Sequence, residues 1–129
     1  MIDLPTDCLA VRQPWAWALI HAGKDVENRS WNVYKADWKF RGRVAILASR
    51  GLTQAEYWGA AEDINSIRFR SCPAPADLIR GAIIGSVEIY GKTRHSDSPW
   101  FVGPGALLVR NPIPCEPVPV DGQLGFFKW

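Results

Sequence analysis

A short segment after the first expected helix carries two cations and a carboxylate. Lys24, Glu27 and Arg29 follow Gly23, and glycine commonly ends helices because it adopts left-handed backbone conformations easily. In the extended segment expected over 26–31, residues of one parity share a face, so Glu27 and Arg29 should point the same way. Cations contact phosphate, and a carboxylate accepts hydrogen bonds from base amino groups. The spacing therefore indicates a site whose chemistry suits a nucleotide.

Aromatic and polar residues elsewhere in the chain extend this candidate site. Most of the seven tryptophans are expected in the core, because each buries a large apolar area. Trp15 and Trp31 flank the charged segment, and their positions fit packing and base stacking equally well. Trp100 sits in a Gly/Pro-rich loop, where an indole is harder to bury, which favours a binding role. Ser49 and Arg50 follow a buried strand and could reach a ligand phosphate, although Ser49 could instead cap a turn.

Each charged residue also has a purely structural interpretation. Glu27 and Arg29 could form a structural ion pair in which Arg29 is the buried member. Lys24 could be a solvated surface lysine. If the ligand-binding interpretation holds, Trp15, Lys24, Glu27 and Ser49 should converge on one concave site near the start of the first helix.

The elements that would position these residues are short strands, with two helices early in the chain. Alternating and apolar runs predict strands over 8–12, 43–48, 82–90 and 106–110, and a closing segment over 124–129. Helices are expected over 14–23 and 53–69, the second opened by the capping-box pair Thr53 and Glu56. Gly85 indicates a bulge, and the prolines of 113–120 restrict that stretch to an edge strand or connector. This pattern predicts an α+β fold, a small mixed β-barrel of five or six strands with two main helices.

The bulk composition fits one small globular domain spanning residues 1–129. Hydrophobic residues make up 47% and charged residues 22%, and the net charge of +2 is too mild to indicate nucleic-acid binding by itself. No apolar run approaches the ~20 residues that span a membrane, and no signal peptide is evident, so a cytoplasmic location is expected. Three widely spaced cysteines and two histidines favour neither a disulfide framework nor a structural zinc site. We expect no metal and no cofactor.

The stretch from Leu9 to Trp31 resembles the signature of the ASCH family, the activating signal cointegrator homology domains. The family pattern G-x-K-x-x-E-x-R maps onto Lys24, Glu27 and Arg29, with Ala22 at the glycine position. The segments 41–51, 85–89, 98–101 and 122–127 extend the resemblance over nearly the whole chain. The family is similar to the PUA-like superfamily, so the resemblance implies a small β-barrel that binds RNA or a modified nucleoside or nucleotide.

The resemblance leaves more than one activity open. The leading hypothesis is a domain that binds or processes RNA or a modified nucleoside. Relatives that hydrolyse acetylcytidine have threonine where this chain has Glu27, so here Glu27 would have to act as base toward water while Lys24 stabilises an oxyanion. A metal-independent ribonuclease would use Glu27 on a 2′-hydroxyl and Lys24, Arg29 or Arg50 on the phosphate. The remaining hypothesis is a non-catalytic module that binds a protein partner.

Overall fold

The structure is a computed structural model that describes residues 4–29, 39–68, 71–123 and 125–129. The described chain contains six strands and two α-helices, with one turn of 3₁₀ helix (Pro75–Asp77) before the fourth strand. The elements follow the order β1 (Asp7–Val11), α1 (Trp15–His21), β2 (Val26–Asn28), β3 (Gly42–Ala48), α2 (Gln54–Ile67), β4 (Ala82–Thr93), β5 (Ala106–Pro119) and β6 (Phe126–Lys128). Both helices thus come early in the chain, before β4, as the sequence predicts.

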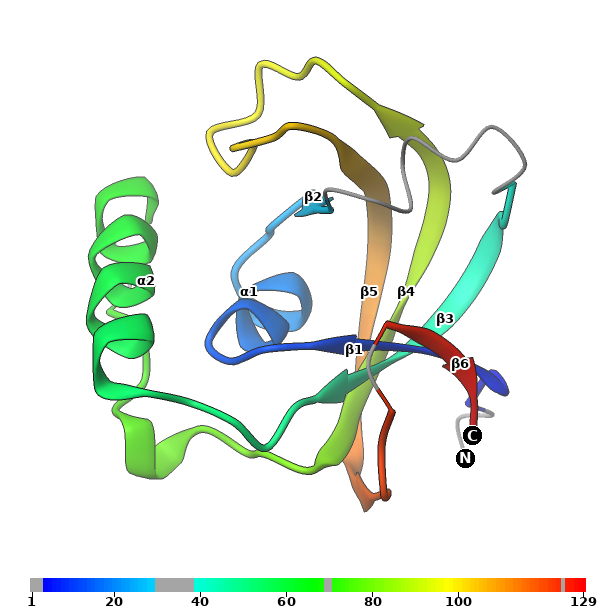
Figure 1. Cartoon of the computed structure of the whole chain (residues 1–129), viewed down its shortest axis with the longest axis horizontal. Coiled ribbons are helices and arrows are strands. Elements are labelled where there is room, and N and C mark those ends of the chain that lie inside the picture. Colours follow the sequence, from blue (N-terminus) through cyan, green and yellow to red (C-terminus); the bar gives the residue numbers. More distant parts are fainter. Residues whose placement is uncertain (1–3, 30–38, 69–70, 124) are drawn as a thin grey trace.

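The strands form one mixed sheet in the order β2-β5-β4-β3-β1-β6. β1 runs parallel to β3, and every other neighbouring pair is antiparallel. The sheet bends around α1 like a barrel wall (Figure 1), but across the described ranges no pairing joins β2 to β6, so the barrel does not close. The predicted α+β class, with six strands and two main helices, is confirmed, and the barrel is an open one.

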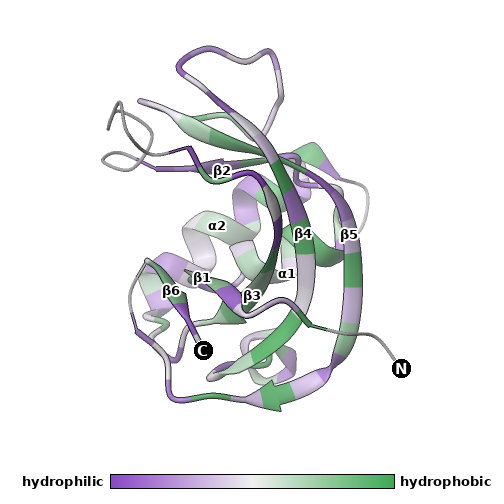
Figure 2. Ribbon diagram, turned by 90° about the vertical axis from the view of Figure 1, so that its right-hand side faces the viewer, coloured by the Kyte–Doolittle hydropathy of each residue, from purple (hydrophilic) through white to green (hydrophobic). Residues whose placement is uncertain are grey.

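The β4–β5 hairpin forms most of the curved wall (Figure 2). Its register shifts between Ile83 and Gly85, which confirms the expected irregularity at Gly85. A Cβ atom at Gly85 would lie 2.6 Å from the carbonyl oxygen of Ile113, so the strands could not approach this closely with another residue there. β5 continues through the proline-rich stretch instead of ending near Arg110. Prolines are tolerated because that half of β5 pairs with β4 alone among the described strands.

Helix α1 packs into the concave side of the sheet and carries Trp15 at its first position. Its buried residues are Ala16, Ala18, Leu19 and Ile20. The buried side chain of Gln13 supports the start of the helix, because its Oε1 accepts from the backbone N–H of Trp17 at 2.9 Å. The Nε2 of Gln13 also donates to the carbonyl oxygen of Ile79 at 2.8 Å. The position of Trp15 is therefore set both by the sheet and by the segment before β4.

Helix α2 lies outside α1, away from the sheet (Figure 1). The capping box is confirmed: Thr53 Oγ1 accepts from the N–H of Glu56 at 3.1 Å, and Glu56 Oε1 accepts from the N–H of Thr53 at 3.2 Å. Tyr57, Ala61 and Ile64 pack in a second core cluster that also includes Trp100. In the parts of the chain that the structure describes, neither helix has the length and apolarity to cross a membrane.

Candidate functional site

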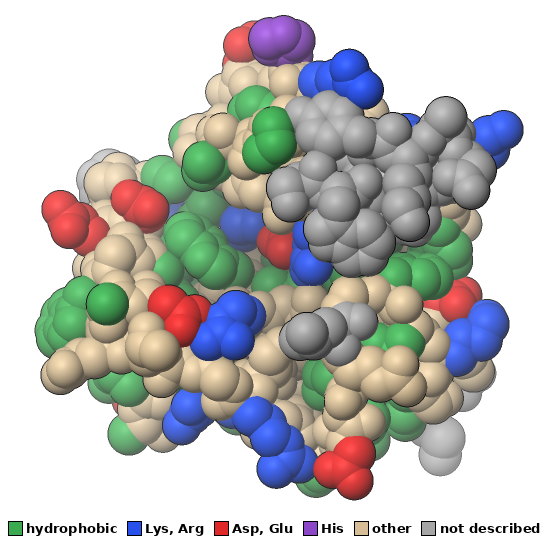
Figure 3. Space-filling view, in the orientation of Figure 1, with side chains coloured by type: hydrophobic (Ala, Val, Ile, Leu, Met, Phe, Trp, Pro, Cys, Tyr) green, Lys and Arg blue, Asp and Glu red, His purple; other side chains and the backbone are tan. Residues whose placement is uncertain are grey.

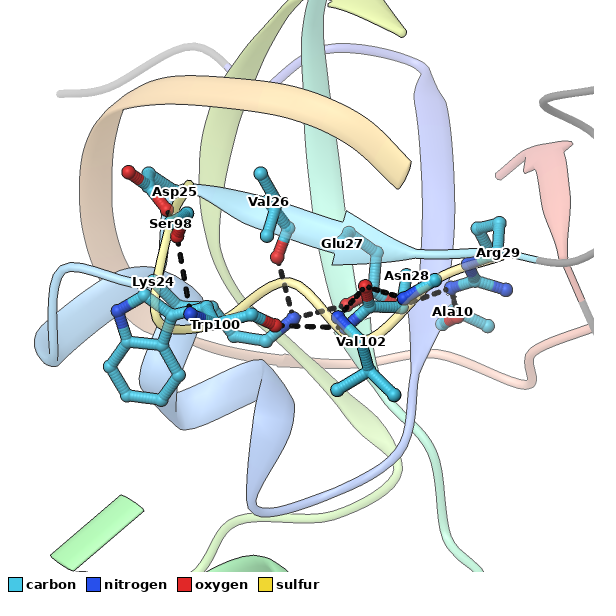
Figure 4. A network of polar contacts seen from close by, with 11 residues as sticks. Ala10, Lys24, Asp25, Val26, Glu27, Asn28, Arg29, Ser98, Trp100 and Val102 are labelled. Atoms are coloured by element: carbon cyan, nitrogen blue, oxygen red, sulfur yellow. Dashed lines mark hydrogen bonds and ion pairs between the residues drawn. The ribbon is translucent and has the colours of Figure 1, made fainter. Parts of the chain in front are cut away.

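Glu27 lies between two cations, one from each side (Figure 4). Lys24 Nζ donates to Glu27 Oε1 at 2.8 Å, and Arg29 Nη2 lies 3.1 Å from Glu27 Oε2. The expectation that Glu27 and Arg29 share a face therefore agrees with their contact. Lys24 Nζ also donates to the carbonyl oxygen of Val26 at 2.7 Å, and its side chain is 2% exposed. The interpretation of Lys24 as a solvated surface lysine is wrong, because the turn after α1 folds it back beneath β2.

The backbone around these residues explains how the ion network forms. Gly23 ends α1 with φ +75°, a conformation that glycine adopts without strain, and the N–H of Lys24 then donates to the carbonyl oxygen of Ala18 at 3.2 Å. β2 pairs with β5, where Glu27 lies opposite Leu107. The Nη2 of Arg29 donates to the carbonyl oxygen of Ala10 at 2.8 Å and so links β2 to β1. Arg29 thus spans the opening of the unclosed barrel.

The ion network is buried and carries a net positive charge. The side chain of Glu27 is 9% exposed and that of Arg29 is 16% exposed. Ions are stable at such burial when they are paired and hydrogen-bonded, and removing one partner leaves the others unbalanced. Two cations and one carboxylate leave one net positive charge facing the neighbouring space. The site is therefore suited to an anionic or carbonyl oxygen of a ligand.

A cavity of about 420 Å³ opens beside this network, which is within the ~300–1,000 Å³ typical of small-ligand sites. Its described polar lining consists of Arg12, Glu27, Asn28, Arg29 and Ser49. Figure 3 shows a hollow in the middle of this face, with basic and acidic side chains inside and hydrophobic ones beside them. The Nε of Arg29 is buried with no acceptor in the described part of the chain. The structure thus brings Glu27 and Arg29, from β2 and the residue after it, together with Ser49, from the end of β3, at one cavity.

The two described tryptophans of the candidate site differ from each other in exposure. Trp15 is half-buried, and Lys24 Nζ lies 5.5 Å from the centroid of its ring, within the range of a cation–π contact. Trp100 is 5% exposed, so the expectation that its loop leaves the indole poorly buried is wrong. The indole packs in the core cluster with Tyr57 and Ile64. Asn28 holds the loop backbone, since it accepts from the N–H of Val102 at 2.9 Å and donates to the carbonyl oxygen of Trp100 at 3.1 Å. Both indoles still line a second hollow of about 220 Å³, so base stacking there stays a prediction.

Two further candidates lie away from the cavity or outside the described residues. The side chain of Arg50 is 71% exposed and does not line the cavity with Glu27. It lines an adjoining pocket together with Ser49, and Ser49 also lines the cavity beside Glu27. Trp31 falls within 30–38, outside the described residues. The role predicted for Trp31 therefore stays a prediction.

Arg12 lines the cavity, and the sequence analysis missed it. The Nη2 of Arg12 donates to Glu56 Oε1 at 2.7 Å, and this contact joins the end of β1 to the start of α2. The hydrogen bonds from Arg12 hold the pKa of Glu56 at about 2, well below its usual range. Capping-box spacing locates Glu56 on the helix, but its second partner lies 44 residues away in sequence. No local pattern signals such a contact.

Comparison with known proteins agrees with the motif-based resemblance. No family model matches the chain. Human activating signal cointegrator 1 is 28% identical over 127 residues, and the match covers 85% of this chain. The match covers 21% of the human protein, so the chain corresponds to about a fifth of that relative's length. Because activating signal cointegrator 1 is the protein that names the ASCH domain, this similarity confirms that the chain resembles the ASCH family.

Proposed function

We propose that this domain binds RNA or a modified nucleoside in the cavity beside Glu27. The observation that carries the proposal is the cavity lining, in which Arg12 and Arg29 supply cations, Glu27 a carboxylate, and Asn28 and Ser49 neutral polar groups. Guanidinium groups suit phosphate or carbonyl oxygens, and carboxylate or hydroxyl groups suit base amino groups and ribose. The resemblance to the ASCH family supports the same class of ligand.

The geometry gives the three charged residues of the network different tasks in this proposal. Lys24 lies behind Glu27 with a nearly fully buried side chain, so it holds the carboxylate in place instead of contacting the ligand. Arg29 lines the cavity and presents positive charge to it. Trp15, which contacts Lys24 through its ring, places an aromatic face in the neighbouring hollow. A base that stacks on Trp15 would gain roughly 1–3 kcal/mol.

Calorimetric titration tests the proposal with cytidine, N4-acetylcytidine and a single-stranded RNA octamer as ligands. Arg12→Ala removes a cation from the cavity wall, and Arg110→Ala is the matched control, because Arg110 is also an exposed arginine paired with a glutamate but does not line the cavity. We expect Arg12→Ala to weaken binding by about two- to fivefold, the size of an exposed ion pair, while the control leaves affinity unchanged. Absence of binding for all three ligands, or equal affinities of the two variants, would contradict the proposal.

A second candidate is hydrolysis, and the observation that favours it is the carboxylate of Glu27 in the cavity wall. Glu27 would take a proton from water, and the resulting hydroxide would attack the acetyl carbonyl of acetylcytidine. Glu27 would then return this proton to N4 as the C–N bond breaks, which releases cytidine and acetic acid, and the acid ionises to acetate. If this activity exists, acetate appears during incubation, and Glu27→Gln lowers turnover by about 10²–10⁴-fold. Cleavage of labelled RNA in the presence of a chelator would indicate the ribonuclease alternative, whereas binding without product favours the binding function.

A further inference from the structure

A pocket separate from the hollow of Trp15 and Trp100 adjoins the cavity beside Glu27 and shares two of its wall residues. This pocket of about 220 Å³ is lined by Arg12, Ser49, Arg50, Gly51, Gly81 and Gly122, among others. Arg12 and Ser49 also line the cavity beside Glu27, so they form a ridge between the two hollows. Further basic side chains lie below the central hollow on the same face of the molecule (Figure 3). A ligand longer than one nucleotide could therefore pass from one hollow to the other over a cationic ridge.

Guanidinium groups of this pocket retain donors for a ligand. Arg12 uses Nε and Nη2 to hold Glu56, and its Nη1 has no hydrogen-bond partner among the residues that the structure describes. Arg50 contacts Asp121 at 3.3 Å, but both side chains are highly exposed, and such pairs are weak. Arg80 Nη1 donates to the carbonyl oxygen of Arg50 at 2.8 Å and places another cation next to the pocket. A phosphate could bind here without breaking a strong contact.

Two glycines in the wall of this pocket leave space for its arginine side chains. A Cβ atom at Gly51 would lie 2.8 Å from Arg12 Nη1, so a side chain there would push the guanidinium aside. At Gly81, where φ is +71°, a Cβ would lie 3.1 Å from the side chain of Arg50. Glycine thus leaves backbone accessible and both arginines in place. Cations beside exposed backbone are an arrangement that suits phosphate and sugar.

From these observations we infer that the pocket is a second subsite, which binds the phosphate and sugar of the nucleotide next to the one in the cavity. The ligand is then single-stranded RNA of at least two nucleotides, with Arg12 contacting the bridging phosphate from the ridge. This inference rests on the proposed function and names its substrate as a polymer instead of a free nucleoside.

The experiment compares ligands of increasing length on the whole domain. Affinities for cytidine monophosphate, a cytidine dinucleotide and an RNA octamer are measured over a salt series. The proteins are the wild type, Arg50→Ala and Arg110→Ala. Arg110 is the matched control because it is also an exposed arginine paired with a carboxylate, that of Glu88, but lies on β5 and lines neither the pocket nor the cavity. Circular dichroism checks that all three proteins are folded.

We expect wild-type affinity to rise from mononucleotide to dinucleotide and octamer. Arg50→Ala should lower the affinity for the octamer by about two- to fivefold more than it lowers the affinity for the mononucleotide. The slope of log affinity against log salt should become shallower by about 0.7, the value for one phosphate contact on a single strand. Arg110→Ala should change neither quantity.

Two results would overturn the inference, and they are distinguishable from failure of the proposed function. If mononucleotide and octamer bind equally, or if Arg50→Ala and Arg110→Ala behave alike, the second subsite does not exist, while binding in the cavity stands. If the wild-type protein binds none of the ligands, the proposed function and the inference fail together.

Discussion

The Lys24–Glu27–Arg29 network and the Arg12–Glu56 pair both contribute to the walls of one cavity, but they do so in opposite environments. In the network the side chains of Lys24 and Glu27 are 2% and 9% exposed. Those of Arg12 and Glu56 are 47% and 36% exposed. The buried network depends on all its members, because an unpaired ion there loses both its partner and its water. The exposed pair depends little on either member, because water and salt replace the contact.

This difference separates the residues that shape the site from those that remain free to recognise a ligand. Glu27 binds its two cations tightly and holds β2 near β1 through Arg29. Arg12 is positioned by Glu56 but keeps unused donors on the ridge between the two hollows. Substitutions in the network should therefore act first on stability, and those on the ridge first on ligand affinity.

Glu27→Gln should have the largest effect. The change removes the charge that balances Lys24 and Arg29, and we expect a loss of about 3–5 kcal/mol in the free energy of unfolding. Denaturant titration followed by tryptophan fluorescence measures it. Glu56→Gln is the matched control, since it makes the same chemical change in the exposed pair. If both variants lose the same free energy of unfolding, the proposed difference between buried and exposed ion contacts is wrong.

Lys24→Met should have an intermediate effect. Methionine keeps an unbranched chain of similar length, and Glu27 retains its contact with Arg29. The carbonyl oxygen of Val26 loses its donor, and we expect a loss of about 1–3 kcal/mol in the free energy of unfolding. The same denaturant titration measures it. A loss as large as that of Glu27→Gln would mean that Lys24, and not the carboxylate, is the centre of the network.

The contribution of Glu56 should depend on pH in a defined window. The hydrogen bonds from Arg12 lower the pKa of Glu56 from 4.5 to about 2, so the folded state favours the carboxylate. This stabilisation is complete above pH 4.5 and disappears as the pH falls toward 2. Glu56→Gln should therefore have a lower Tm than the wild type at neutral pH, and the difference should narrow through this window. If the difference in Tm stays constant from pH 5 to pH 2, the charge of Glu56 contributes nothing to stability through its pair with Arg12.

Arg50→Ala should have the smallest effect on stability. Its contact with Asp121 is long and exposed, and surface changes of this kind alter the free energy of unfolding by about 0.5 kcal/mol or less. Thermal unfolding measures the change. A larger loss would indicate that Arg50 supports the pocket wall, and a reduced affinity for RNA could then not be assigned to a direct contact.

Predictions from the sequence were most accurate where the cause is local. The capping box at Thr53, the irregularity at Gly85 and the shared face of Glu27 and Arg29 each depend on neighbours a few residues apart or on intrinsic backbone preference. The burial of Trp100 was misjudged because its indole packs against α2 and its loop is held by Asn28, and both lie far from it in the chain. The Arg12–Glu56 pair escaped notice for the same reason.

Three features could be predicted from local sequence patterns alone: the α+β class, the helix that ends at Gly23, and the charged residues grouped after it. Their spacing is enough to place a carboxylate and a cation on one side of a strand. Three other features depend on packing between distant segments: the burial of Lys24, the place of Ser49 and Arg12 in the same cavity as Glu27, and the pocket on the other side of Arg12 and Ser49. These outcomes depend on how β1, β2 and β3 meet at the open side of the curved sheet. Such contacts between distant segments follow from packing and strand order, which short-range sequence patterns do not specify.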